Sequence, residues 1–437
     1  MTEIESVLRT RDVHPMFQPI VDLATGEVVA VEALARGPAG PLHAPDALLG
    51  AGRAAGRLAE LDLLCRTRAV ETALAAGLAG PAMLFVNAEP AATGVEVLPS
   101  READALRRRG LRLVVELTER ALMQEPGRLL AFADHAHEQG WGIALDDVGA
   151  DPGSLALMPF LRPDVIKLDL GVVQRRPDVD VARIMTAVNA HAEESGAVVL
   201  AEGVETAAQE RDAHGLGATL AQGWRYGRPA PAEEVLPRFP PPVLPLLLPG
   251  GERRPAPRSP FDAVHRWRPA RHGTKGLLLE VTRLLERRAT EMQGLAVVLA
   301  TFQFAPNITP KTERRYTDLV ERTALVVALG AGMSDEPLPG LRGAALLADD
   351  PVLGEWDVAV VGPHYAAALV ARDLEEPGVD DGDRPFDYVL THDRTLVLDV
   401  ARSLMGRALT SQQQTGTSEA PEVSEAPEVT AEVAVQA

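Results

Sequence analysis

Carboxylate and amide side chains recur where apolar segments end in the first half of the chain. The residues concerned are Glu32, Asn87, Glu116, Asp146, Asp147 and Glu202. All six offer oxygen donors, and no His or Cys lies beside them. Hard cations such as Mg²⁺ and Mn²⁺ prefer oxygen ligands, whereas Zn²⁺ more often takes nitrogen and sulfur. These residue types therefore favour a Mg²⁺ or Mn²⁺ site, provided that the fold brings them together.

Two adjacent aspartates and one lysine refine this chemistry. Side chains alternate along a strand, so Asp146 and Asp147 can reach one site only where their strand is ending and twisting. One of them could then bridge two metals, and a pair of metals about 3.5–4 Å apart is a recurring device for phosphate-ester hydrolysis. Lys167 lies in the next apolar segment, DVIKLD, where its charge could orient the attacking water or stabilise developing charge. The pattern predicts a metal-dependent enzyme.

The apolar segments that must position these side chains indicate buried parallel strands. They are rich in β-branched residues and show no alternation, which is typical of strands covered on both faces. We predict strands centred on Phe17, Val29, Phe85, Val114, Ala144, Ile166, Val199 and Ala221. Helical patterns cover residues 45–77, 127–140 and 179–196.

Eight strands with intervening helices predict an α/β fold, a (β/α)8 TIM-like barrel over about residues 12–228. Its site would lie at the carboxyl ends of the strands. An open doubly wound sheet is the alternative, but no Gly-rich turn follows the first strand.

The second half of the chain indicates a linker, a smaller domain and a tail. Proline is dense from Pro229 to Pro260, which prevents regular structure and predicts a linker at 241–258 after a barrel at 1–240. A second α/β or α+β domain is expected over 259–410. Residues 411–437 repeat SEAPEV without a basic residue and predict a disordered acidic tail.

The expected elements of the second domain follow from its apolar patterns. The segment PKTERRYTDLVERTALVVALG indicates one helix that ends at GAGMS, and another helix is expected from Tyr365. Strands are expected in LAVVLATFQF and near Ala345, Val360 and Val389, with helices in GLLLEVTRLLERRA and TLVLDVARSLMGRAL. Trp356 and Phe386 are expected in the core rather than in a ligand site.

Composition limits the partners and the compartment. The chain has 437 residues, too many for one core, and a formal net charge of −19, which argues against general attraction to nucleic acid or anionic lipid. Cys65 is the only cysteine, so no intrachain disulfide can form. We expect no signal peptide and no membrane span, and therefore a cytoplasmic protein without nucleic-acid or membrane partners.

Motifs over about residues 10–235 resemble the EAL-type cyclic di-GMP phosphodiesterases. They occur in the family's order and are FQPIVDLATGEVVAVEALAR, FVN, ELTE, DDVG, PDVIKLD, AEGVET and QGWRYGRP. The resemblance implies a barrel with one antiparallel strand. It also implies hydrolysis of bis-(3′,5′)-cyclic dimeric GMP to the linear dinucleotide pGpG in bacterial signalling.

The resemblance further implies a role for each matching residue, with two Mg²⁺ or Mn²⁺ ions per site. The ligands of the first metal match Glu32, Asn87, Glu116 and Asp146. The ligands of the second match Asp146, Asp147 and Glu202, with Asp146 bridging. Lys167 matches the lysine beside the nucleophilic water, and Gln222 a glutamine of the metal and water shell. Gln18 and Arg36 match substrate contacts, the arginine to phosphate through its fork of donors. Glu119 matches a glutamate that stabilises the loop after the aspartates.

That loop departs from the family's pattern. DDFGxGYSSL is usual, whereas DDVGADPGSL stands here, so that Val148, Asp151, Pro152 and Gly153 replace Phe, Gly, Tyr and Ser. The family's loop couples dimer contacts to metal positioning, and a proline fixes φ and removes an N–H. Two hypotheses stay open. One is an active phosphodiesterase, and the other is a weak or inactive domain that acts as a cyclic di-GMP receptor or partner-binding protein. Hydrolysis of another phosphodiester is a third, against which EALAR and QGWRYGRP argue.

Motifs in the second domain resemble the DICT domain, a sensory module. They are SPFD, the pair Phe302-Gln303, RRYTDL, DDPVLGEWDVAVVGPHYAAALVARD and RPFDYVLTHDRTLV. The resemblance implies an unknown signal or protein partner that regulates the barrel, but no particular ligand. The EAL resemblance also implies a homodimer through the barrel. A monomer that pairs only when the second domain binds its signal is the alternative.

Overall fold

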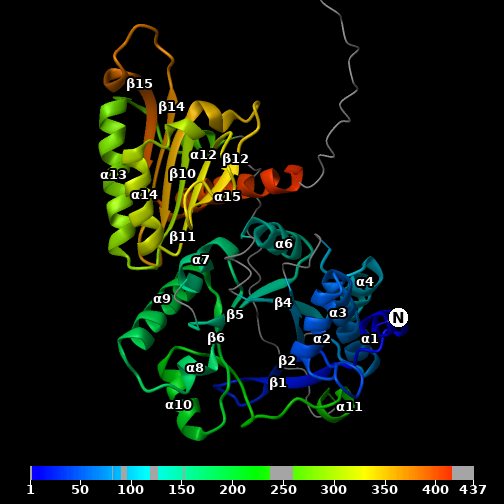
Figure 1. Cartoon of the computed structure of the whole chain (residues 1–437). Coiled ribbons are helices and arrows are strands. Elements are labelled where there is room, and N and C mark those ends of the chain that lie inside the picture. Colours follow the sequence, from blue (N-terminus) through cyan, green and yellow to red (C-terminus); the bar gives the residue numbers. More distant parts are fainter. Residues whose placement is uncertain are drawn as a thin grey trace, which may run out of the picture.

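The structure, a computed structural model, describes residues 2–80, 82–89, 96–118, 126–150, 153–236 and 259–415. They form two bodies, a closed eight-stranded barrel and a separate seven-stranded sheet (Figure 1). The expected linker at 241–258 lies outside the described residues, and so do residues 416–437 of the expected tail.

The barrel closes in sequence order, and every strand expected from the sequence is present in it. Strand β1 pairs antiparallel with both of its neighbours, β2 and β8, while the remaining strand pairs are parallel. The strands are β1 (Met16–Asp22), β2 (Val28–Leu34), β3 (Met83–Ala88), β4 (Arg112–Thr118), β5 (Gly142–Val148), β6 (Val165–Leu168), β7 (Val198–Ala201) and β8 (Leu220–Gln222). The predicted TIM-like barrel with one antiparallel strand is therefore confirmed, and the open doubly wound sheet is wrong.

Helices surround the barrel. They are α1 (Glu3–Thr10), α2 (Pro45–Ala54), α3 (Leu58–Ala75), α4 (Ser100–Arg109), α6 (Pro126–Glu138), α7 (Gly153–Leu161), α8 (Leu170–Val173), α9 (Val179–Ser195), α10 (Ala207–Gly215) and α11 (Ala232–Val235). The helical pattern at 45–77 is two helices, because Gly56 adopts a left-handed φ of 65° between α2 and α3.

The barrel interior has an apolar layer made by one residue from each strand. Its members are Ile20, Ala30, Phe85, Val114, Ala144, Val165, Leu200 and Leu220, all buried. Side chains two residues apart along a strand point to the same side. The next inward position toward the carboxyl ends of β2–β8 is therefore a second layer, and β1, running the other way, contributes to it from the residue two positions earlier.

The second domain is a mixed sheet covered by helices on both faces (Figure 1). Its strand order is β12-β11-β10-β13-β14-β15-β9, in which β10, β11 and β12 are parallel and the other pairs antiparallel. The strands are β9 (Arg271–Thr274), β10 (Val297–Phe304), β11 (Leu325–Ala331), β12 (Arg342–Ala345), β13 (Glu355–Val361), β14 (Ala366–Asp373) and β15 (Pro385–Thr391). The helices are α12 (Pro260–His265), α13 (Lys275–Glu291), α14 (Pro310–Arg322) and α15 (Arg394–Thr415).

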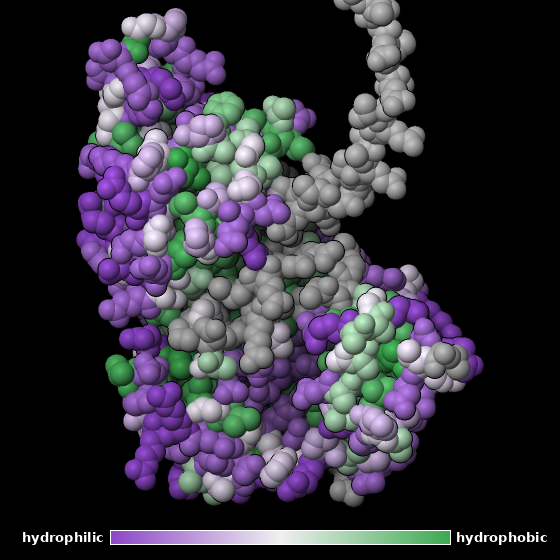
Figure 2. All heavy atoms as spheres, viewed as in Figure 1, coloured by the Kyte–Doolittle hydropathy of each residue, from purple (hydrophilic) through white to green (hydrophobic). Residues whose placement is uncertain are grey.

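Alternating residues of this sheet pack against different helices. Val298 and Ala300 of β10 lie in a cluster with Leu285 of α13, whereas Val297 and Leu299 lie in a cluster with residues of α15. Helices α13 and α14 therefore cover one face, and α15 covers the other. Figure 2 shows mostly hydrophilic residues on the outer side of α13 and α14, as expected for amphipathic helices.

Two element predictions in this domain are wrong. Helix α14 ends at Arg322, and Thr323 is extended, so the segment ALVVALG is strand β11 and GAGMS follows a strand rather than a helix. The helix expected from Tyr365 is strand β14, whose alanines are buried in the middle of the sheet. Burial between two helix layers outweighs the intrinsic helix preference of alanine there.

Helix α15 also contacts the barrel. It packs against α6 and α7, and one contiguous apolar cluster includes Phe160 of α7 and Leu404 of α15. Arg402 of α15 forms an ion pair with Asp134 of α6 and donates to the carbonyl of Phe160. Arg394 adds an ion pair with Glu194 at 2.9 Å. Among the described residues, none of the helices combines the length and apolar character needed to cross a bilayer.

A buried ion pair ties α3 to the residues on either side of the undescribed segment after β3. Arg66 pairs with Asp62 one turn away, and both side chains are buried. Asp62 Oδ1 accepts from the backbone N–H of Glu89 at 3.1 Å, and Arg66 Nε donates to the carbonyl of Val97 at 2.9 Å. Burial raises the pKa of Asp62, and the Arg66 charge opposes that shift.

We predict that Arg66→Leu lowers the free energy of unfolding by roughly 3–5 kcal/mol, because Asp62 would be left buried without its partner. The midpoint of thermal unfolding of the full chain at pH 7, followed by circular dichroism, measures the loss. Arg107→Ala, which breaks an exposed pair with Asp104, is the control and should leave the midpoint nearly unchanged. Equal midpoints for the two variants would contradict the prediction.

Candidate metal centre

The second inward layer of the barrel is polar on every strand. It consists of Gln18, Glu32, Asn87, Glu116, Asp146, Lys167, Glu202 and Gln222. Each lies two positions from a member of the apolar layer, so strand alternation directs both layers into the barrel. Strand register brings several of them side by side, since Gln18 is the partner of Glu32 and Asn87 that of Glu116. The structure thus brings together eight of the predicted site residues.

Lys167 lies at the centre of this layer and is almost completely buried. Its Nζ is 2.6 Å from Glu116 Oε1, 2.8 Å from Glu202 Oε1 and 2.9 Å from Asp146 Oδ1. Glu32 Oε2 is farther away, at 3.9 Å. One ammonium therefore faces four carboxylates, and the layer has a surplus of negative charge when all four are ionised.

A β-bulge brings both aspartates to the site. Leu145 pairs with Ile166 and Val148 with Leu168, so β5 has one residue more than β6 across this interval. Asp147 adopts a left-handed φ of 59°, which is uncommon outside glycine but more accessible to Asp and Asn. The sequence predicted that the strand must end and twist here, and the bulge is the form that the twist takes.

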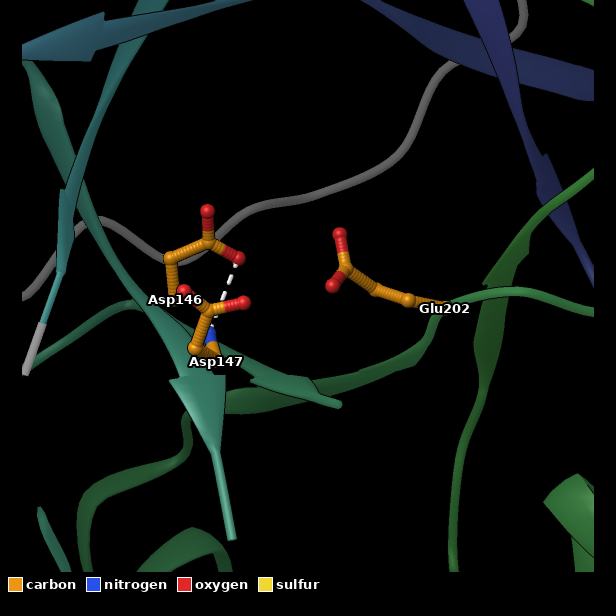
Figure 3. Close-up of side chains that lie close together, drawn as sticks. All are labelled: Asp146, Asp147 and Glu202. Carbon is orange, nitrogen blue, oxygen red and sulfur yellow. Dashed lines mark hydrogen bonds between the residues drawn. The ribbon is translucent and has the colours of Figure 1, made fainter. Parts of the chain in front are cut away.

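The bulge directs Asp146 and Asp147 toward Glu202. Carboxylate oxygens of the three residues lie within 4.8 Å of one another, as a shared cation would require. Figure 3 shows Asp146 and Asp147 on β5 opposite Glu202, which follows β7. The backbone N–H of Asp147 donates to Asp146 Oδ1 at 3.0 Å and restricts the orientation of that carboxylate.

Amide side chains orient Glu32. Asn87 Nδ2 donates to Glu32 Oε1 at 3.0 Å, and Gln222 Nε2 donates to Glu32 Oε2 at 2.7 Å. Gln222 Nε2 also lies 3.1 Å from Gln18 Oε1, and Gln18 Nε2 donates to the carbonyl of Gly227. The amides therefore orient the Glu32 carboxylate without adding charge.

Burial and the crowd of like charges shift the pKa values of the carboxyl groups. Burial raises the pKa of Glu116 well above its usual range, and the Glu32 charge adds to the effect while Lys167 opposes it. Burial likewise raises the pKa of Glu202 to about 8. Burial acts to raise the pKa of Glu32 too, but the Lys167 charge and hydrogen bonds outweigh it, so that pKa is lowered. Burial acts to lower the pKa of Lys167, but the surrounding carboxylates, Asp146 foremost, raise it.

These observations fit a pair of hard divalent cations. The donor set consists of oxygens, which Mg²⁺ and Mn²⁺ prefer. Glu116 Oε1 contacts Lys167, but Glu116 Oε2 and Gln222 Oε1 are buried without a hydrogen-bond partner among the described residues. Such acceptors are costly to bury unless something binds them. A cation beside them would also offset the surplus negative charge of the layer.

Some predicted site residues lie elsewhere. Arg36 follows β2, is half-buried and donates to the carbonyl of Ala35, so its side chain takes no part in the network around Lys167 as described. Glu119 lies outside the described residues, as do Asp151 and Pro152 of the altered loop. The predictions for Glu119, Asp151 and Pro152 stay predictions, and so does the substrate contact of Arg36.

Sequence reasoning missed two supports of the site. The sequence predicts Lys167 beside a water but not its role as counter-ion to four carboxylates. A signal for that role was present, because four acids and one lysine lie at strand ends of one predicted barrel. The Asp62–Arg66 pair was also missed. Its signal is an acid and an arginine four residues apart on the apolar side of a predicted helix.

Two family profiles match the chain. The profile of the EAL domain matches residues 2–229, more than half of the chain. The profile described as a sensory domain in diguanylate cyclases and two-component systems, DICT, matches residues 265–374. The second match identifies most of the seven-stranded sheet as a DICT domain.

Curated relatives and solved structures resemble the barrel half. Cyclic di-GMP phosphodiesterase NbdA of Pseudomonas aeruginosa is 32% identical over 240 residues, which cover 52% of this chain and 30% of the relative. Probable cyclic di-GMP phosphodiesterase PdeB of Escherichia coli is 28% identical over 53% of this chain and 46% of its own length. The chain thus spans less than half of each relative. A manganese and cyclic di-GMP complex of Klebsiella pneumoniae BlrP1 is 28% identical, with a TM-score of 0.44 over 50% of this chain and 56% of that one.

Metal uptake at this site should release protons. The pKa of Glu202, raised to about 8, means that this carboxyl group holds a proton at pH 7 when no metal is bound, and a cation must displace it. We expect Mn²⁺ binding to the metal-free full chain to release at least about one proton at pH 7. The number should fall as the pH rises through about 8, because Glu202 of the metal-free chain loses its proton over that range.

Isothermal titration calorimetry at pH 7 in PIPES and in Tris measures this release, because the two buffers take up protons with different enthalpies. Glu202→Gln should release fewer protons. Glu205→Gln, which changes an exposed neighbour of the same chemistry, should behave as the unaltered protein. Identical binding enthalpies in both buffers would contradict the assigned protonation.

Proposed function

Because the chain belongs to the EAL-domain family, we propose that its barrel hydrolyses cyclic di-GMP to linear pGpG with two Mg²⁺ or Mn²⁺ ions. The observation that carries the proposal is the convergence of Asp146, Asp147 and Glu202 within 4.8 Å, beside the cluster around Lys167. That donor set suits an anionic phosphodiester only if cations intervene, since bare carboxylates would repel it.

Each site residue has a place in this reaction. Glu32, Asn87, Glu116 and Asp146 would hold one cation, and Asp146, Asp147 and Glu202 the other. When bound, the two ions would neutralise the phosphodiester and lower the pKa of a water. Gln18, Gln222 and Arg36 would bind the substrate, the arginine at a phosphate.

The hydrolysis needs a nucleophile, a broken bond and a proton. Water attacks one phosphorus of the ring, the P–O3′ bond breaks, and the 3′ oxygen takes up a proton to leave pGpG. Lys167 is buried among the acids, so its ammonium can orient the water and stabilise negative charge that develops on the phosphate. A low-dielectric surrounding strengthens that interaction.

Turnover should depend on the carboxylates that crowd Lys167. With Mn²⁺ or Mg²⁺ present, the purified full chain should convert cyclic di-GMP to pGpG slowly, as followed by chromatography. We predict that Glu32→Ala and Asp146→Asn abolish product formation, and that Lys167→Ala reduces kcat on the order of 10²-fold. Glu27→Ala, a change outside the site, is the control.

Two results would redirect the proposal. Product formation that survives Glu32→Ala would refute the site assignment. Tight binding of cyclic di-GMP with no product at any metal concentration would establish the receptor alternative, which the altered loop at Val148–Gly153 favours. Hydrolysis of other phosphodiesters at an equal rate would establish the third hypothesis, a barrel hydrolase for another phosphodiester.

Regulation by the DICT domain is part of the proposal, and α15 supports it. Arg402 binds the carbonyl of Phe160, at the C-terminal end of α7. Helix α7 is the next helix after β5, the strand that carries Asp147, and it packs against β5. A shift of α15 would therefore reach the aspartates through one helix. A homodimer through the barrel belongs to the same proposal, with the signal-dependent monomer as its alternative.

Arg402→Ala should weaken metal binding at a distance. Loss of the contacts to Asp134 and Phe160 frees α7, and we predict that the Mn²⁺ concentration for half-maximal turnover rises at least about threefold, an energy of roughly 0.7 kcal/mol. Assays of the full chain over a Mn²⁺ series measure it. Arg322→Ala, an exposed arginine of the same domain, is the control. An unchanged Mn²⁺ dependence for Arg402→Ala would exclude this route.

A further inference from the structure

A cavity of about 480 Å³ lies in the DICT domain between α13, α14 and the sheet. This volume falls in the range of small-molecule sites, about 300–1,000 Å³. Helix α13 contributes Thr282 and Glu286, and α14 contributes Arg315 and Tyr316. The strands contribute the end of β10 and the start of β13, including Trp356.

The cavity occupies the position where α/β folds usually bind ligands. It opens at the carboxyl end of β10, whose parallel neighbour is β11. Lys275 begins α13 and Thr309 caps α14, so both helices begin at the cavity. Helix N-termini carry partial positive charge and attract anions.

Backbone strain marks the same place. Thr301 pairs with Leu329 and Phe304 with Ala331, so β10 bulges by one residue there. Gln303, inside the bulge, adopts a left-handed φ of 55° and lines the cavity. Non-glycine residues in this conformation cluster at ligand sites.

A buried carboxyl group lies in the wall of the cavity. Glu286 is 2% exposed and faces the Tyr316 hydroxyl and the Arg315 guanidinium, and a carboxylate has lone pairs for more donors than these two. Arg315 Nε lies 2.5 Å from Glu286 Oε2, but Nε forms no hydrogen bond among the described residues, so the pair is an ion pair of poor alignment. The buried Thr282 hydroxyl has no hydrogen-bond partner within the part of the chain that the structure describes. The cavity therefore offers acceptors to a molecule that carries a donor.

Basic side chains outnumber acidic ones in the lining, and ion pairs neutralise four of them, Lys275, Arg283, Arg315 and Arg384. Five basic side chains line the cavity against two acidic ones, Glu286 and Asp381. Asp381 is already paired with Lys275 at 2.6 Å. Lys311, at the start of α14, has no ion-pair partner among the residues that the structure describes. An anionic group would complete the charge balance near it.

Aromatic side chains give the cavity flat walls. Phe302 and Tyr316 pack edge to face at 5.2 Å, and both line it. Trp356 packs against the core, as expected, where it contacts buried Phe386, and it also borders the cavity. Such surfaces suit a planar ring.

We propose that this cavity binds a small planar organic anion, with its charged group at Lys311 and an N–H or O–H group donating to Glu286. Lys311 and Arg315 lie about one helical turn apart on α14, and Arg315 contacts Glu286, so one side of a small cavity carries both the cation and the acceptor. The inference is independent of the reaction proposed for the barrel.

Three probes separate the two ends of the site. They are 4-hydroxybenzoate, which has both groups, benzoate, which lacks the donor, and phenol, which lacks the charge. Calorimetry or ligand-observed NMR on the full chain should give saturable binding of 4-hydroxybenzoate, with benzoate and phenol each about tenfold weaker, since a hydrogen bond to a charged group contributes about 1.5–3 kcal/mol.

Variants assign each end to its residue. Glu286→Gln should weaken 4-hydroxybenzoate about tenfold and leave benzoate unchanged, whereas Lys311→Ala should weaken both carboxylates and leave phenol unchanged. Arg322→Ala, on an exposed part of α14, is the control. Thr282→Val tests the inner end again should Glu286→Gln fail to fold.

Three outcomes would overturn the proposal. One is no saturable binding of any probe, the second is equal binding of all three, and the third is equal weakening of benzoate and 4-hydroxybenzoate by Glu286→Gln. Because binding is measured without turnover, these results do not depend on whether the barrel is active.

Discussion

Repulsion among buried carboxylates is the constraint around which the barrel is arranged. Four acids approach one ammonium that is almost completely buried, where water screens the charges poorly. A lone lysine cannot balance that charge, so the layer is stable only with protons or cations. The apolar layer directly beneath excludes water from below, and the amides of Asn87 and Gln222 hold Glu32 without adding a further charge. The cluster of carboxylates is unfavourable without metal because its charges repel one another, and the same cluster is therefore already arranged to bind cations.

Both domains use one backbone device at the mouth of a sheet. In each, a strand gains one residue against a parallel neighbour, and the extra residue is a non-glycine in the left-handed conformation: Asp147 in the barrel and Gln303 in the DICT domain. The bulge turns a side chain that would otherwise lie in the sheet's outer layer toward the space beyond the strand ends. The strained left-handed backbone of such residues persists only where the surrounding packing enforces it. Both buried sheets supply that packing.

The sequence predicted the barrel well because its strands are apolar, short and separated by clear helices. It predicted Glu32, Asn87, Glu116, Asp146 and Glu202 because each ends an apolar segment, and Lys167 because it lies in the next such segment, whereas Gln18 and Gln222 were predicted only from the resemblance to the EAL family. It failed where local preference and burial disagree. The alanines of β14 favour a helix in isolation, and ALVVALG follows a true helix without a glycine or proline to mark its end. It could not predict the ion pairing of Lys167 or the contact of Arg402 with α7, because both depend on distances between segments remote in the chain.

Helix α15 packs against both the sheet of the second domain and the barrel. Its Val397, Val400 and Leu404 share an apolar cluster with the sheet that they cover and with the outer helices of the barrel. The proline-rich stretch therefore separates the two domains in the sequence. Cutting the chain there would not separate them cleanly in space. Grafting a different sensor onto this barrel would require the newcomer to bring a matching helix surface, or the exposed outer helices would be left to aggregate. When sensory domains are exchanged in such proteins, the choice of the new domain should thus depend on the helix surface that packs against the barrel rather than on the proline-rich stretch.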